Sequence, residues 1–144
     1  MPIRQQHRWL YPIDWRELSA AIRFKRAKGR CEHCGRPHGR IVKHLGDGRW
    51  WDEERATWRC GKGRVVRPLP KPEPESQTAR TTRVILATAH LDHDPTNNRF
   101  GNLKALCQRC HMIHDRKEHV RRRRLTYRMR KALGDLFLGP YRTR

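Results

Sequence analysis

Residues 89–114 read AHLDHDPTNNRFGNLKALCQRCHMIH, and this stretch decides how the chain is interpreted. It holds four histidines and a Cys-x-x-Cys pair within a length that suits a hairpin followed by two turns of helix. Imidazole and thiolate groups are the side chains that most often bind transition metals in proteins. The stretch therefore predicts metal chemistry.

Two Cys-x-x-Cys pairs stand far apart in the sequence. Cys31 and Cys34 lie in CEHCG, and Cys107 and Cys110 lie in CQRC. Each pair has the spacing that brings two thiolates to one tetrahedral zinc, and two pairs supply its four ligands. We expect this Zn²⁺ to be structural, because four thiolates leave no open position for water. Cys60, in WRCGKG, is expected to be a small side chain in a strand or turn and not a ligand.

The composition points to an anionic partner. The chain has 144 residues, with 34 Lys and Arg against 14 Asp and Glu, a formal net charge of +20. This length suits one domain with a modest core, and so large a charge repels itself unless a partner neutralises it. Nucleic acid is the leading candidate, and DNA is the partner that we expect. An acidic membrane surface comes second, because no long apolar run or lipid-anchoring signal supports it.

The N-terminus and the cysteines indicate a reducing compartment. The first ten residues, MPIRQQHRWL, contain no apolar segment of the kind that marks a secreted protein. We therefore expect a cytoplasmic location, where cysteines serve more readily as metal ligands than as disulfides.

A helix is predicted from residue 14 to residue 29. Asp14 is a suitable N-cap, Glu17 stands three residues later as its capping-box partner, and Gly29 is a natural stop. Ile13 and Leu18 have the spacing of a hydrophobic staple. The apolar face of this helix consists of Trp15, Leu18 and Ile22.

The middle of the chain alternates β-like runs with glycine turns. Residues 39–69 predict small hairpins, and the proline-rich residues 71–78 predict a loop. RVILATAH, residues 83–90, is the strongest strand in the sequence and ends at His90. A polar turn then leads into the segment that carries the second cysteine pair.

The C-terminal segment is predicted to be a basic helix. It should begin at about Cys107 and end at Gly134, and a break near the arginine run 121–124 is an open alternative. Residues 116–144 hold eleven Lys and Arg against two acids. An apolar stripe consists of Leu125, Met129 and Ala132. The side chains expected to contact nucleic acid are Arg121, Arg124, Arg128 and Lys131, although such a run is equally typical of a solvated helix face.

The order of His90, Asn102 and His111 resembles the HNH endonuclease family, whose core is the ββα-metal fold. The motif here is AHLDHDPTNNRFGNL followed by LCQRCH, with His90 twelve residues before Asn102 and His111 nine residues after it. The resemblance covers roughly residues 31–34 and 83–115, and it is to the zinc-stapled branch with two Cys-x-x-Cys pairs, as found in phage and bacterial proteins. It implies an endonuclease whose products carry 5′-phosphate and 3′-hydroxyl ends.

The chemistry of phosphodiester cleavage assigns roles to these three residues. The reaction needs a base that activates water and a cation that neutralises the charge building on the phosphate. His90 is a suitable general base, because a histidine with an ordinary pKa of about 6.5 is partly neutral near pH 7. His111 is expected to hold a catalytic Mg²⁺ or Mn²⁺. By the resemblance, Asn102 holds the intervening loop through hydrogen bonds to the backbone.

One position departs from the HNH pattern. Many members carry Asp or His directly before the base, where it helps to hold the catalytic metal, and this chain has Ala89. The second protein ligand is therefore unassigned, and Asp92, His93 and His114 are the alternatives.

The sequence thus predicts an α+β fold with a small ββα-metal core and a Cys₄ zinc, in one domain spanning residues 1–144. Its segments are an N-terminal helical part (1–30), a zinc knuckle (31–38), a hairpin insertion with a proline-rich loop (39–82), the core (83–115) and a basic helical extension (116–144). A zinc-stabilised nucleic-acid-binding module with a decayed nuclease site is the main alternative. A nuclease that works only when docked in a phage packaging or defence assembly is another.

Overall fold

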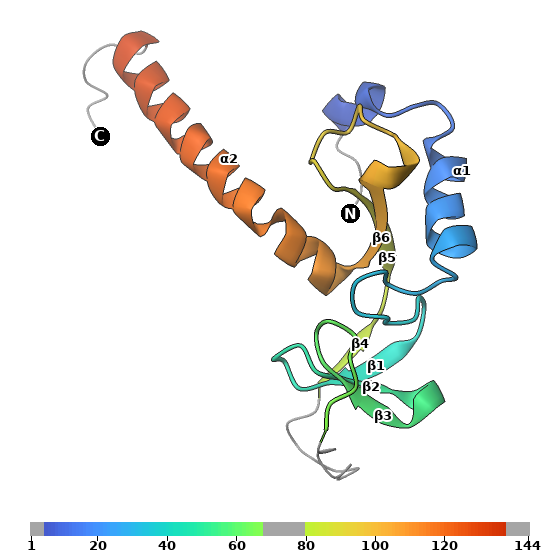
Figure 1. The fold of residues 1–144 in the computed structure, drawn as a ribbon. Coiled ribbons are helices and arrows are strands. Elements are labelled where there is room, and N and C mark those ends of the chain that lie inside the picture. The colour runs from blue at the N-terminus through green and yellow to red at the C-terminus, as the bar shows by residue number, and fades with distance from the viewer. Residues whose placement is uncertain (1–4, 68–79, 138–144) are drawn as a thin grey trace. The chain divides into compact units, whose positions relative to one another are not determined.

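The computed structural model describes residues 5–67 and 80–137 and has an α+β architecture with two antiparallel sheets (Figure 1). It divides into two compact units, Met1–His111 and Met112–Arg144, and each is described by itself. No helix in the described part of the chain is long and apolar enough to cross a membrane.

The N-terminal helix lies where the sequence predicts it. A 3₁₀ segment η1 (Gln5–Leu10) precedes α1 (Trp15–Ala20), which continues into the π-helical segment η2 (Ala21–Arg26). The chain leaves the helix through Lys28 and Gly29, which both have positive φ, and the amide of Gly29 donates to the carbonyl of Arg23 at 2.9 Å. Gly29 therefore helps to end the helix, because a residue without a Cβ adopts positive φ at little steric cost.

Two details of the predicted N-terminal cap are wrong. Asp14 is the N-cap, but its side chain makes no capping hydrogen bond, because its φ of −91° and ψ of 17° lie outside the extended region from which such a side chain reaches the next amides. Ile13 is fully exposed, with a relative accessibility of 105%, so no hydrophobic staple forms with Leu18.

The predicted apolar face of this helix is confirmed. Ile22 is fully buried with Leu103 and Ala105, and Trp15 and Leu18 pack against this small core. The face therefore anchors the helix to one side of a hairpin that the chain reaches some eighty residues later.

The first sheet has four strands in the order β3-β2-β1-β4, all antiparallel. These strands are β1 (Ile41–His44), β2 (Trp50–Asp52), β3 (Thr57–Arg59) and β4 (Arg80–Arg83), and a short 3₁₀ turn η3 (Glu53–Arg55) joins β2 to β3. The predicted hairpins are thus confirmed between residues 41 and 59. Directly after β3, an isolated bridge joins Arg59 to Val65. The predicted loop at 71–78 lies outside the described residues.

The second sheet is the hairpin of β5 (Leu86–His90) and β6 (Leu103–Cys107), with a 3₁₀ turn η4 (Phe100–Asn102) before β6. Its register pairs Leu86 with Cys107 at one end and His90 with Leu103 at the other. The hairpin therefore connects the second cysteine pair to His90 by one continuous ladder of backbone hydrogen bonds.

The prediction of one strand over residues 83–90 is wrong at its start. Arg83 ends β4 and pairs with Ile41, and the chain changes sheets at residues 84 and 85. The side-chain amide of Gln108 holds this change, because it donates to the carbonyl of Arg83 at 2.9 Å and accepts from the amide of Ile85 at 3.1 Å. The β-branched residues of this run predict a strand, but they do not show that Gln108 takes over the backbone hydrogen bonds of Arg83 and Ile85.

The larger core contains the four paired cysteines themselves. Its buried members are Cys31, Cys34, Val42, Trp50, Val84, Leu86, Ala89, Leu106, Cys107 and Cys110. They come from the knuckle, from both sheets and from the start of the last helix. The cysteines therefore occupy positions where a small domain of this kind would otherwise place aliphatic side chains.

The last element is α2 (Gln108–Phe137), a single continuous helix. The predicted stop at Gly134 and the alternative of a break at residues 121–124 are both wrong. Arginine and lysine have high helix propensity, and one glycine costs only about 1 kcal/mol. Glu118 adds ion pairs with Arg121 and Arg122. In the second unit, Leu125 and Met129 of the expected apolar stripe are exposed.

A glycine substitution tests how tightly the insertion packs on the knuckle. A Cβ at Gly63 would stand 3.0 Å from the carbonyl oxygen of Cys34, whereas a Cβ at Gly46 would meet nothing within 4 Å. Both have positive φ, +79° and +84°, so alanine costs each about 1 kcal/mol in backbone strain. We expect Gly63→Ala to lose about 1–3 kcal/mol more than Gly46→Ala in urea unfolding of the zinc-loaded protein. Equal losses would contradict the packing.

Candidate metal centre and hairpin site

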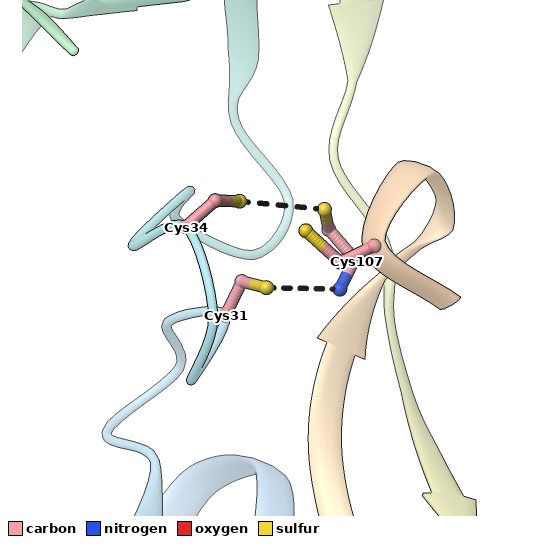
Figure 2. A group of neighbouring side chains, drawn as sticks. Cys31, Cys34 and Cys107 are labelled. Atoms are coloured by element: carbon pink, nitrogen blue, oxygen red, sulfur yellow. Dashed lines mark hydrogen bonds between the residues drawn. The ribbon is translucent and has the colours of Figure 1, made fainter. Parts of the chain in front are cut away.

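The four paired cysteines converge at one point in the first unit. Their sulfur atoms all lie within 4.8 Å of one another, and Cys34 Sγ is 3.6 Å from Cys107 Sγ (Figure 2). Tetrahedral zinc with Zn–S bonds of about 2.3 Å separates its sulfurs by about 3.8 Å, whereas a disulfide brings them to about 2.05 Å. The cluster therefore has the spacing of a metal site and not of a disulfide.

Local backbone geometry presents each pair. Cys31 and Cys34 lie on a turn in which the amide of Gly35 donates to the carbonyl of Cys31 at 2.8 Å, and Gly35 has the positive φ, +77°, that such a turn requires. Cys107 ends β6 and Cys110 lies in the first turn of α2. The amide of Cys107 donates to Cys31 Sγ at 3.3 Å, which Figure 2 shows as a direct link between the two pairs.

The protonation of the cluster explains why it needs a cation. The pKa of Cys31 is strongly lowered, first by its hydrogen bond with Cys107, and that of Cys107 falls to about 6, first through Cys110. The pKa values of Cys34 and Cys110 are raised instead, in both cases first by Cys107. Four buried thiols cannot all ionise side by side, whereas a divalent cation favours the thiolate at each of them. The donor set therefore fits zinc.

A salt bridge makes a second connection between the knuckle and the hairpin. Glu32 binds the edge of β6 through two hydrogen bonds with Ala105. The backbone amide of Glu32 donates to the carbonyl of Ala105 at 2.9 Å, and the amide of Ala105 donates to the Glu32 carboxylate at 2.6 Å. Arg26 binds the same carboxylate with two nitrogens, at 3.1 and 2.8 Å, and also donates to the carbonyl of Leu103 at 2.5 Å. This link does not depend on a metal, and no pattern in the sequence predicted it.

His90 stands at the end of β5, half-buried under side chains of the N-terminal segment. Its ring stacks on that of Trp15, with centroids 5.1 Å apart and an interplanar angle of 12°, and Tyr11 meets it edge-on at 5.8 Å. His90 Nε2 lies 3.0 Å from Asn98 Oδ1. Burial raises the pKa of Tyr11. Sequence reasoning missed Asn98, Trp15 and Tyr11, because no spacing rule relates them to His90.

Asn102 holds the loop between the strands. Its Nδ2 donates to the carboxylate of Asp92 and to the carbonyl of Asn97, both at 2.8 Å, and its Oδ1 accepts the amide of Asp92 at 3.2 Å. Asn97 donates to the same carboxylate at 2.6 Å. These bonds, that of Asn102 foremost, lower the pKa of Asp92 to about 2. The loop is thus fixed by its own side chains.

The remaining predicted site residues come from the turn after β5 and from α2. His111 is half-buried in the first turn of α2, His93 follows β5 with a φ of +61°, and His114 lies on α2 in the second unit. Within residues 5–67 and 80–137, neither His90 nor His111 belongs to a group of three or more metal-ligating side chains that converge.

Ala89 and Cys60 also have definite places. Ala89 is 2% exposed and belongs to the larger core, so residue 89 faces the interior. Cys60 is half-buried in the turn after β3 and lies outside the four-cysteine cluster, as predicted.

Compared with protein-family models, with curated proteins and with solved structures, the chain matches none of them. The function of the protein is therefore inferred from its residues and their geometry.

Removal of one thiolate tests the metal centre. We expect close to one zinc per chain by elemental analysis of protein purified without chelator, because the four sulfurs already lie within 4.8 Å of one another. Cys107→Ser should empty the site or unfold the first unit, while Cys60→Ser, which changes a cysteine outside the cluster, should keep its zinc. Full zinc content in Cys107→Ser would refute the assignment.

Proposed function

We propose that the chain is a metal-dependent endonuclease of the HNH type that cleaves DNA. The observation that carries the proposal is the order of elements around the hairpin. His90 ends β5, Asn102 directly precedes β6 and holds the loop, and His111 lies in the first turn of the helix that follows. This is the arrangement that a ββα-metal core requires of its three signature residues.

In the proposed reaction, His90 takes a proton from a water molecule whose oxygen attacks phosphorus. The bond to the 3′ oxygen then breaks, that oxygen takes up a proton from solvent water, and the products carry 5′-phosphate and 3′-hydroxyl ends. His111 would hold Mg²⁺ or Mn²⁺, which neutralises the charge that builds on the phosphate and on the leaving oxygen. Asn102 keeps the loop in place, so that His90 needs no rearrangement to reach its substrate.

The basic face of α2 supports DNA as the substrate. In the second unit, one groove along the helix is lined by Lys117, Val120, Arg121, Arg124, Leu125 and Arg128. The four cations among them recur at helical spacing, so they share one face, and Lys131 continues it. A row of exposed cations on a protein with a charge of +20 suits the phosphates of a duplex.

A second candidate function is binding without cleavage. The observation that favours it is the burial of Ala89, which removes the usual place for a second ligand to the catalytic metal. Asp92 is an ionised carboxylate two residues after His90, and it offers a substitute. Cleavage that appears only after a partner protein is added would instead favour a nuclease that works within a larger assembly.

Removal of the proposed base tests the enzyme directly. His90→Ala should reduce nicking of supercoiled plasmid by about 10²- to 10⁴-fold, because it removes a proton acceptor that acts in the transition state. Binding of DNA should be little changed, since the basic face is intact. His44→Ala is the matched control, because His44 lies in the other sheet, where it bonds Thr82 and the Gly46 amide. Equal cleavage by the two variants would end the HNH proposal.

Charge removal on opposite faces of α2 tests the binding surface. Neutralising Arg121, Arg124 and Arg128 to glutamine should reduce the slope of log affinity against log salt by about two to three units, because each lost phosphate contact contributes about 0.9. The control changes Arg116, Arg123 and Arg130, which lose the same charge from the opposite side of the helix. If both triple variants change the slope equally, the groove has no special role.

A further inference from the structure

The orientation of one loop amide defines the proton on His90. Asn98 Nδ2 donates to the carbonyls of Pro95 and Thr96, both at 3.2 Å. An amide nitrogen only donates and an amide oxygen only accepts, so these two bonds turn Asn98 Oδ1 toward His90. The oxygen lies 3.0 Å from His90 Nε2 and has no proton to give. Nε2 must therefore be the donor.

We propose that Asn98 is a positioning residue that keeps the proton of neutral His90 on Nε2 and its lone pair on Nδ1. The inference rests on the proposed function, in which His90 is the general base. A neutral imidazole carries its proton on one nitrogen only, and the bond made by one nitrogen decides which of the two is basic. Asn98 thus selects the atom of His90 that accepts the proton from water.

The same contact serves His90 before and after it accepts a proton. An imidazolium donates from both nitrogens, so the bond from Nε2 to Asn98 persists when Nδ1 is protonated. Asn98 remains neutral throughout and needs no change of its own. The ring therefore keeps one orientation during the reaction, which is the arrangement that pre-organised general bases require.

Two aromatic rings reinforce this orientation. Trp15 stacks nearly parallel to His90, and Tyr11 meets it edge-on. Turning the imidazole over would exchange its nitrogens with its carbons, and it would have to move against both rings and give up the bond to Asn98. The N-terminal segment consequently contributes to the site through these two rings.

Nuclear magnetic resonance on the full zinc-loaded chain tests the proton position without any assay of cleavage. Long-range ¹H–¹⁵N correlation of histidine-labelled protein, at a pH where His90 is neutral, should show a protonated Nε2 and an unprotonated Nδ1. His90→Gln identifies the signals. The opposite pattern in the wild-type chain would overturn the proposal, and a variant is needed only to assign the His90 signals.

Substitutions of Asn98 separate positioning from support of the loop. Asn98→Leu removes the acceptor, so both ring nitrogens should shift toward values averaged over the two tautomers. Asn98→Asp keeps an acceptor and should keep the proton on Nε2. Thr96→Val is the control, because it breaks the loop bond from Thr96 Oγ1 to Asp94, at 2.7 Å, without touching His90. Unchanged nitrogen shifts in Asn98→Leu would contradict the role.

Kinetic measurements test the effect of Asn98 on cleavage. Together with the spectra, they show whether the Asn98 proposal or the nuclease proposal has failed. Asn98→Leu should lower kcat about 10- to 100-fold with little change in KM, and Asn98→Asp should restore most of the loss. An altered tautomer with unchanged kcat would overturn the positioning role. A wild-type chain that keeps the proton on Nε2 but never cleaves DNA would overturn the nuclease proposal and leave the tautomer assignment intact.

Discussion

The convergence of four sulfurs is the constraint on which the first unit depends. Cys34 and Cys107 stand 73 positions apart in the sequence, yet their sulfurs lie 3.6 Å from each other in the larger core. The chain has only 35% hydrophobic residues and a charge of +20, so few apolar side chains remain to offset its self-repulsion. A cation bound by four thiolates would contribute binding energy directly to folding. The cluster thus replaces part of an ordinary hydrophobic core.

The position of the hairpin follows from that cluster. Cys107 is both a member of the cluster and the last residue of β6, so the ladder from Cys107 to His90 begins at a fixed point. Glu32 and Arg26 fix the opposite edge of β6 through hydrogen bonds that need no metal. Gln108, next to Cys107, holds the chain where it passes from one sheet to the other. The parts of the candidate site are therefore placed by residues that take no part in its chemistry.

Local patterns in the sequence predicted what local physics decides. The apolar face of α1 and η2, the end of β5 at His90 and the two cysteine pairs were all readable, because each depends on short spacings. The errors lie where a tertiary contact overrides such a pattern. The run 83–90 reads as one strand, but Gln108 and the pairing of β4 divide it. Ile13 matches a staple in spacing and is nevertheless fully exposed. The surroundings of His90 were also unreadable, since Trp15 precedes it by 75 positions.

The distribution of charge around the proposed site suits the binding of a metal cation. The loop between β5 and β6 carries Asp92 and Asp94 against a single Arg99, within a chain that is otherwise strongly basic. The amides of Asn97 and Asn102 hold Asp92 ionised, which is the state that attracts a hard cation. A uniformly basic surface would bind phosphate and repel the metal ion needed to cleave it. In the proposed nuclease, neutral amides would resolve this conflict, because they order Asp92 and His90 without adding positive charge to the place where the proposed cation would bind.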